Sequence, residues 1–196
     1  MSETNNNKVN HHLFKGEGKV VSFSKETLEK VQQLILRYPE GQEKSALLPV
    51  LHIAQEELGG YLSVDVMDYV AGLLGIEPIE VYEVATFYSM FNLEKVGKYV
   101  IEVCQTGPCS IAGGDAILGH LVSTLQIKPG ETTKDGLFTL KTVECLGSCG
   151  TSPVMQINTE FYEKLTPAKV DQIIEKHRQP EDPESSGGQR WVEKFF

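Results

Sequence analysis

The sequence predicts an α+β protein in which an N-terminal helical bundle, residues 24–95, precedes an α/β domain, residues 96–178. Apolar residues recur every three or four positions from Ser24 onward, which is the period of an amphipathic helix. After Gly97 the apolar residues alternate with polar ones, which is the period of a strand. A chain of 196 residues with 40% hydrophobic content can bury one or two cores, so cysteine cross-links are not needed for its stability.

Short helices fill the predicted bundle, and each is bounded by residues that start or stop helices. Serine or proline stands at three of the expected starts, and proline or glycine follows three of the expected ends. The predicted segments are Ser24 to Tyr38, Leu47 to Leu58, Ser63 to Leu74 and Pro78 to Ala85. Helices of this length joined by short breaks pack as a small bundle.

The α/β domain has the order strand, helix, strand, strand, strand, helix. The expected elements are residues 99–103, 110–125, 137–143, 153–157, a strand that begins at 161–162, and 166–177. The first two strands form a parallel pair joined by a right-handed helical crossover, and the later strands form a meander on the same sheet. This order matches the thioredoxin-like layout.

Both termini have the composition of irregular segments. Residues 1–23 are polar and without periodicity, which predicts a flexible arm. Residues 179–196 join a Pro, Ser and Gly linker to an aromatic tail that contains Trp191, the only tryptophan. Two interpretations of this tail stay open: it packs back onto its own domain, or it docks on a partner subunit.

Charge and targeting signals exclude several classes of protein. The net charge of −9 disfavours binding to nucleic acid, which depends on clustered Lys and Arg. The first twelve residues resemble neither a secretory signal nor a transit peptide, and we expect a reducing cytoplasmic location. No apolar run approaches the roughly 20 residues that span a bilayer, so direct membrane insertion is not expected.

The four cysteines of the sequence form two tight pairs. Cys104 and Cys109 have the spacing C-x4-C, Cys145 and Cys149 have the spacing C-x3-C, and 35 residues separate the pairs. Cys104 and Cys145 each follow a strand of the predicted parallel pair, so both loops converge on one edge of the sheet. A disulfide framework does not fit a reducing compartment, and the sequence has no C-x-x-C redox motif. The pairs therefore predict a four-thiolate metal centre.

Loop length favours a [2Fe-2S] cluster over zinc but leaves both open. Structural zinc sites of four cysteines usually present C-x2-C knuckles, and the loops here are one and two residues longer. A binuclear cluster is larger than a single ion, and plant-type ferredoxins use a C-x4-C element. Small residues in both loops let backbone N–H groups approach sulfur. Glu102 and Glu144 flank the loops and neither loop contains Lys or Arg, which predicts a potential on the order of −400 mV.

The sequence resembles the 24 kDa subunit family of respiratory complex I, NADH:quinone oxidoreductase, whose bacterial members are called the E subunit. The segments that carry the resemblance are Ala46–Glu57, Val81–Phe91 and the cysteine segments, among which Glu144–Gly150, with the sequence ECLGSCG, is the most specific. The likeness extends from about residue 27 to residue 177. The first cysteine loop departs from many members at Gln105 to Pro108, and the aromatic tail lies outside the shared pattern.

The resemblance implies a helical bundle followed by a thioredoxin-like [2Fe-2S] ferredoxin domain, with Cys104, Cys109, Cys145 and Cys149 as the cluster ligands. It implies a flavin-bearing partner subunit that oxidises NADH, and other peripheral-arm subunits, in a complex at the bacterial inner membrane. The cluster exchanges electrons with FMN on that partner. FMN and NADH are not expected on this chain, which has no complete G-x-G-x-x-G and no P-loop.

Three alternatives to this interpretation stay open. Relatives of the same family serve NAD-linked hydrogenases and formate dehydrogenases. A structural zinc module would use the same four cysteines, and a ferredoxin that acts alone would lack the helical bundle. His52 and His120 fall within helical patterns and are expected to be packed or surface histidines, because four thiolates already complete a ligand set.

Overall fold

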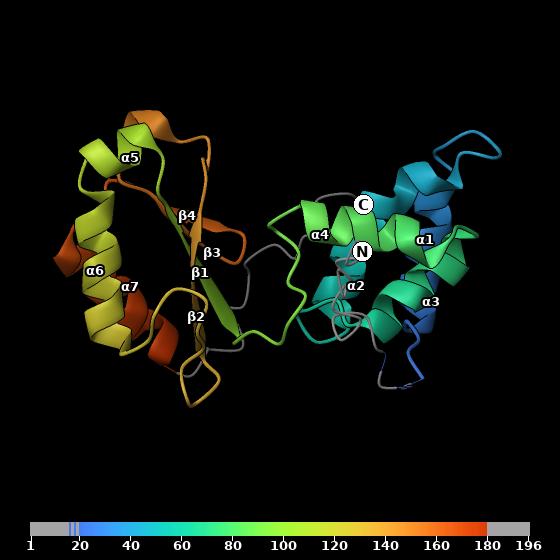
Figure 1. Ribbon diagram of the computed structural model, residues 1–196, viewed down its shortest axis with the longest axis horizontal. Coiled ribbons are helices and arrows are strands. Elements are labelled where there is room, and N and C mark those ends of the chain that lie inside the picture. The colour runs from blue at the N-terminus through green and yellow to red at the C-terminus, as the bar shows by residue number, and fades with distance from the viewer. Residues whose placement is uncertain (1–15, 17, 19, 180–196) are drawn as a thin grey trace, which may run out of the picture. The chain divides into compact units, whose positions relative to one another are not determined.

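The computed structural model describes residues 16, 18 and 20–179, which divide into two compact units, residues 1–94 and 95–196 (Figure 1). Most of the expected N-terminal arm and almost the whole expected C-terminal tail, including Trp191, therefore lie outside the described residues. No helix in the described part of the chain is long and apolar enough to cross a bilayer.

The regular elements in the described part of the first unit are all helices. They are α1 (Lys25–Ile35), the short 3-10 helix η2 (Glu43–Ala46), α2 (Leu47–Glu57), α3 (Val64–Leu74) and α4 (Pro78–Phe87). Ser24 and Ser63 are N-caps whose hydroxyl oxygens accept hydrogen bonds from backbone N–H groups of the first turn. Gly75 ends α3 in the left-handed conformation, with φ of 63°, a conformation that favours glycine.

The first helix is shorter than the sequence predicts. It ends at Ile35 rather than Tyr38, and the next residues form tight turns in which the N–H groups of Arg37 and Tyr38 donate to the carbonyls of Leu34 and Ile35. The residue before a proline is disfavoured in the helical conformation, and Pro39 follows Tyr38 directly. The apolar period therefore continues past the end of the α-helix.

Specific contacts hold residues near the beginning and the end of the described part of the first unit. Phe23, which falls within the range expected to be a flexible arm, is only 5% exposed and packs edge-on against Tyr69, with ring centroids 5.2 Å apart. The buried Asn92 donates from Nδ2 to the Gly60 carbonyl at 2.9 Å, and its N–H donates to Gln55 Oε1 at 2.6 Å. These bonds tie the end of the unit to the end of α2.

The second unit contains a four-stranded mixed sheet with helices on one face (Figure 1). Its elements are β1 (Tyr99–Cys104), α5 (Gly107–Ile111), α6 (Gly114–Leu125), β2 (Phe138–Val143), the 3-10 helix η3 (Cys149–Thr151), β3 (Met155–Ile157), β4 (Glu160–Tyr162) and α7 (Pro167–Arg178). The strand order is β2-β1-β3-β4, in which β1 and β2 are parallel and the other pairs antiparallel. The predicted order of elements is confirmed, except that the single helix expected from Ser110 is divided into α5 and α6 at Gly113, whose φ is 97°.

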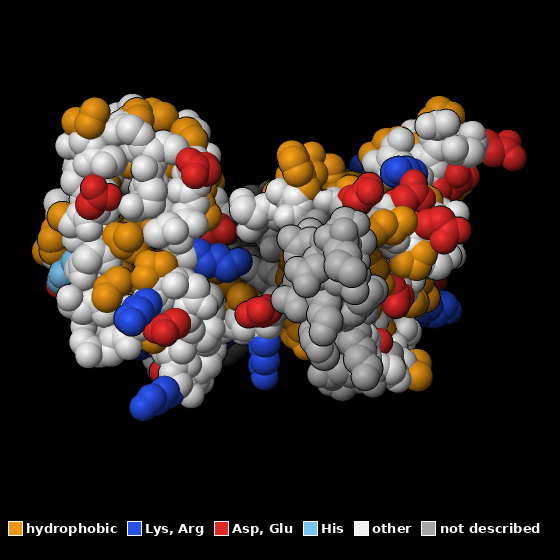
Figure 2. All heavy atoms as spheres, viewed as in Figure 1, with side chains coloured by type: hydrophobic (Ala, Val, Ile, Leu, Met, Phe, Trp, Pro, Cys, Tyr) orange, Lys and Arg blue, Asp and Glu red, His pale blue; other side chains and the backbone are white. Residues whose placement is uncertain are grey.

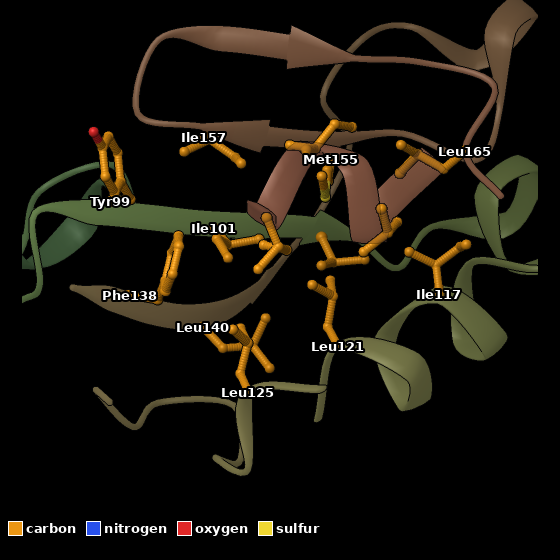
Figure 3. Packing of buried hydrophobic residues seen from close by; sticks show 14 of the residues in the cluster. Tyr99, Ile101, Ile117, Leu121, Leu125, Phe138, Leu140, Met155, Ile157 and Leu165 are labelled. Carbon is orange, nitrogen blue, oxygen red and sulfur yellow. The ribbon is translucent and has the colours of Figure 1, made fainter. Parts of the chain in front are cut away.

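Apolar side chains from alternate strand positions form the core of the second unit. Ile101 of β1, Leu140 of β2 and Met155 of β3 are fully buried. Figure 3 shows Ile117 and Leu121 of α6 directed at the same core. A separate, smaller buried cluster, formed by Cys104, Cys109 and Val154, lies at the carboxyl end of β1.

Candidate metal centre

The four cysteines occupy two segments that leave the same edge of the sheet. Cys104 is the last residue of β1 and Cys109 lies in α5, whereas Cys145 follows β2 and Cys149 begins η3. The parallel register pairs Cys104 with Val143, so both segments begin at the same level of the sheet. The N–H of Gln105 donates to the Val143 carbonyl at 3.0 Å, which extends this pairing into the first loop. Figure 1 shows α5 and η3 at one end of the unit.

The pairs differ in burial. Cys104 and Cys109 are each 2% exposed and pack against Val154 and Leu146, whereas Cys145 and Cys149 are exposed. In Figure 2 hydrophobic side chains, a class that includes cysteine, gather at the end of the second unit where α5 lies, and basic side chains lie nearer its other end. One pair is thus anchored in the protein while the other faces solvent.

The sulfur atoms of the exposed pair have a separation that suits a shared metal. Cys145 Sγ and Cys149 Sγ are 3.8 Å apart. Two thiolates on one tetrahedral metal at bond lengths of about 2.3 Å are separated by about 3.8 Å. No three or more His, Cys, Asp or Glu side chains converge as ligands of a single ion within residues 16, 18 and 20–179. The observation that supports a shared metal is thus the distance between the sulfur atoms of Cys145 and Cys149, which fits two ligands of one tetrahedral metal.

Hydrogen bonds join the two cysteine segments. The Ser152 hydroxyl lies 3.4 Å from Cys109 Sγ and donates to the Cys149 carbonyl at 2.9 Å. The N–H of Cys104 donates to the Val154 carbonyl at 3.2 Å. Cys145 and, more weakly, the thiols of Cys109 and Cys104 raise the pKa of Cys149, as expected where like charges are brought together. The structure thus places the two cysteine segments next to each other, and a shared ligand set of four thiols stays a prediction.

Donors around the sulfur atom of Cys104 favour its thiolate, the form of cysteine that binds metal. Burial acts to raise the pKa of Cys104, but the Thr106 hydroxyl and the backbone N–H groups of Thr106 and Leu146 outweigh it, so the pKa is lowered. Thr106 Oγ1 lies 3.2 Å from Cys104 Sγ. The Gly147 N–H donates to Cys145 Sγ at 3.3 Å, and the φ of Gly147 is 78°. These are the close backbone approaches that small loop residues were expected to provide.

Comparison with known proteins gives the family. The model of the family described as thioredoxin-like [2Fe-2S] ferredoxin matches residues 31–178. The chain belongs to this family. The resemblance predicted from the cysteine segments and the helical motifs is confirmed at this level.

Relatives of this ferredoxin are named as respiratory subunits. The E subunit of the NADH-quinone oxidoreductase of Rickettsia typhi is 47% identical over 156 residues, which are 80% of this chain and 92% of that protein. The mitochondrial NADH dehydrogenase [ubiquinone] flavoprotein 2 of Dictyostelium discoideum is 45% identical over 154 residues, which are 79% of this chain and 62% of that protein.

A solved structure of an NAD+-reducing [NiFe]-hydrogenase in its air-oxidised state is also similar. It matches with a TM-score of 0.61 and 25% identity over 75% of this chain. The match covers only 25% of the length of that hydrogenase chain.

Two structural supports of the cysteine segments were not predicted from the sequence. A Cβ atom added to Gly114, at the start of α6, would lie 2.8 Å from the Cys109 carbonyl oxygen and 3.3 Å from that of Cys104. Glu163, between β4 and α7, accepts hydrogen bonds from the hydroxyls of Ser148 and Thr151, the latter at 2.7 Å. The Gly113-Gly114 pair was a signal for the first support. The second had none, because its partners lie 12 and 15 residues away.

The two histidines considered from sequence have other surroundings. His52 is half-buried in α2 with its ring 4.9 Å from that of Phe91, and burial lowers its pKa to about 4. His120 Nε2 of α6 lies 2.6 Å from Asp171 Oδ1 of α7, a contact that joins the two helices on the sheet. The observed contacts of both rings are with protein side chains outside the cysteine loops.

Proposed function

We propose that the chain is the electron-transfer subunit of an NADH:quinone oxidoreductase, complex I. It would carry one [2Fe-2S] cluster, held by Cys104, Cys109, Cys145 and Cys149, that exchanges electrons with FMN on a neighbouring NADH-oxidising subunit. The observation that carries the proposal is that two segments, each with two cysteines, leave the same edge of the sheet in a chain of the [2Fe-2S] ferredoxin family. The names of the 47% and 45% identical relatives support the choice of complex.

The four thiols fit a binuclear cluster. Each iron of such a cluster takes two cysteine ligands, and the wide C-x4-C and C-x3-C loops suit its size. A bound [2Fe-2S] cluster supplies reversible one-electron chemistry. The buried pair, Cys104 and Cys109, would anchor it, and the N–H of Gly147 would stabilise negative charge on Cys145 Sγ. Exposure of Cys145 and Cys149 leaves one side of the site open to an electron partner.

Partner contacts belong to the same proposal. The helices of the first unit would form a bundle that docks within the peripheral arm of the complex, beside the flavin-bearing subunit and other peripheral-arm subunits. The protein would be held peripherally at the inner membrane of a bacterium through the complex. An isolated chain would accept and donate electrons without turning over a substrate, since NADH and FMN would be bound by the partner.

The visible spectrum of anaerobically purified protein tests the cluster. We expect a brown protein with two irons and two acid-labile sulfides per chain, whose absorption bleaches with dithionite, as for [2Fe-2S] ferredoxins in general. A double Cys145→Ser and Cys149→Ser variant is the control and should be colourless. Colourless wild-type protein with one zinc per chain would overturn the proposal in favour of a structural zinc module.

A role in an NAD-linked hydrogenase is the second candidate, and a formate dehydrogenase would be analogous. The similarity to the NAD+-reducing [NiFe]-hydrogenase is the observation that favours it. Affinity purification of the assembled complex decides between the candidates. Hydrogen-dependent reduction of NAD+ by that complex would support the hydrogenase, and NADH-dependent reduction of quinone would support complex I.

A further inference from the structure

Glu163 links the segment between β4 and α7 to the loop of the second cysteine pair. Its Oε1 accepts hydrogen bonds from the hydroxyls of both Ser148 and Thr151. Ser148 and Thr151 lie on either side of Cys149 and Gly150. One carboxylate oxygen therefore holds the two ends of the short turn that carries an exposed cysteine.

The segment around Glu163 is itself well fixed. The N–H of Lys164 donates to the Thr151 carbonyl at 2.7 Å, and the N–H of Leu165 donates to the Pro153 carbonyl at 3.1 Å. Lys169 Nζ, from the first turn of α7, donates to the Glu163 carbonyl at 2.6 Å. The carboxylate is thus presented to the cysteine loop from a rigid base.

Leu146 is the partly buried apolar side chain of this loop, and it packs against Cys104, Cys109 and Val154. Cys145, Gly147, Cys149 and Gly150 are exposed, in contrast with the buried Cys104 and Cys109. Polar contacts therefore have a larger part in positioning Cys149, which follows Leu146 in the loop and is itself exposed. The two bonds to Glu163 are the side-chain contacts that join this loop to the segment between β4 and α7 among the described residues.

The carboxylate also brings a negative charge to Ser148 and Thr151, which lie on either side of Cys149 and Gly150 in the sequence. Hydrogen bonds from Ser148 and Thr151 and the charges of Lys164 and Lys169 lower the pKa of Glu163, so it is ionised at neutral pH. A fixed negative charge near an iron–sulfur cluster disfavours the added electron and lowers the reduction potential.

We propose that Glu163 is a positioning residue for the second cysteine pair and lowers the reduction potential of the cluster that this pair helps to hold. The inference rests on the proposed function, since it concerns the same cluster. Glu163 contacts the hydroxyls of residues adjacent to the Cys149-Gly150 turn, so it acts through the loop rather than on the electron partner.

Three variants of the full-length, cluster-loaded chain separate position from charge. Glu163→Ala removes the hydrogen-bond acceptor, and we expect the absorbance of the cluster to be lost to a chelator about tenfold faster. Residues that hydrogen-bond around a metal site without binding the metal typically have effects of this size. Ser148→Ala with Thr151→Val breaks the same bonds but keeps the charge, and should lose the cluster equally fast. Glu163→Gln keeps an acceptor oxygen, so it should retain the cluster with a higher midpoint potential in a redox titration followed by electron paramagnetic resonance.

Controls distinguish this inference from the proposed function. Glu175→Gln removes an exposed carboxylate of α7 and should leave both chelation rate and midpoint potential unchanged. Combining Glu163→Ala with the Ser148 and Thr151 changes should add no further loss, because all three remove one set of bonds. A wild-type chelation rate in Glu163→Ala, or an unchanged midpoint in Glu163→Gln, would overturn the inference alone. Wild-type protein without iron and sulfide would overturn both.

Discussion

At the scale of single residues, the candidate centre has one buried pair of cysteines and one exposed pair. The thiols of Cys104 and Cys109 are buried and have hydroxyl neighbours, Thr106 and Ser152. The thiols of Cys145 and Cys149 are exposed and depend on the Gly147 N–H and on the loop contacts of Glu163. Because burial alone would raise a thiol pKa, donors beside Cys104 are needed to favour its thiolate.

His52 gives a prediction at the same scale, for stability in acid. Burial lowers its pKa to about 4 in the folded chain, whereas an unfolded histidine titrates near about 6.5. The unfolded state binds the proton first as pH falls, so the free energy of unfolding should fall between pH 6.5 and 4. With solvent screening of the partly exposed ring, the loss at pH 5 should be about 1 to 2 kcal/mol.

Urea unfolding at pH 7 and pH 5 measures this loss. The variant His52→Gln lacks the titrating ring, so its stability should decline less over the same interval. Equal declines in the two proteins would show that His52 does not contribute to the acid sensitivity.

Among the elements, the junction between α5 and α6 is the one that most directly shapes the site. The left-handed Gly113 ends the turn after α5, and Gly114 lets α6 begin against the carbonyls of Cys109 and Cys104. A single uninterrupted helix from Ser110, as the apolar period indicates, would not provide this close approach. The break places Cys109 in a short turn of its own beside β1.

Gly114→Ala tests that close approach. The new Cβ would stand 2.8 Å from the Cys109 carbonyl oxygen, a backbone atom, so the loop must shift. We expect a loss of about 1–3 kcal/mol in the free energy of unfolding, the usual cost of overpacking. Chelator-induced loss of the cluster should also be faster.

Gly119→Ala is the matched control on the same helix. A Cβ at Gly119 meets nothing within 4 Å, so the higher helix propensity of alanine should raise the free energy of unfolding by about 0.5–1 kcal/mol. Urea unfolding of both variants checks the pair. Equal effects of the two substitutions would contradict a steric requirement for glycine at residue 114.

For the whole molecule, the main feature is that the chain consists of two compact units with different contents. The first unit, residues 1–94, has helices and its own buried core, and the second, residues 95–196, carries all four cysteines. The described core of the second unit is built from its own strands and helices, and we expect each unit to unfold separately. Cluster binding should then act on the second unit.

Calorimetry of the loaded and the metal-free protein tests this separation. A ligand that binds only the folded state raises the melting temperature, so cluster loading should raise the transition of the second unit by about 10 °C or more. The transition of the first unit should stay within about 2 °C, since no cysteine lies in it. The Cys145→Ser and Cys149→Ser double variant should show no gain, and a single transition that shifts as a whole would contradict independent units.

Much of the helix and strand pattern could be predicted because its signals are local. Ser24 and Ser63 cap the helices that the sequence places after them, and Pro78 and Pro167 stand at the first helical positions. The alternation at residues 99–103 and 137–143 predicted the parallel pair β1 and β2. Errors occur where a local rule interrupts the period, as at Pro39 after α1 and at Gly113 before α6.

The sequence by itself determined the types of the candidate ligands, their spacing and the strand ends from which they leave, because these depend on neighbours along the chain. Tertiary structure decided which pair is buried, how Ser152 bridges the cysteine segments, and that Glu163 holds Ser148 and Thr151. These features depend on contacts between residues far apart in the sequence, such as Cys109 with Ser152, 43 positions away. Such contacts arise only when sheet pairing and helix packing bring the segments together, and no local pattern encodes them.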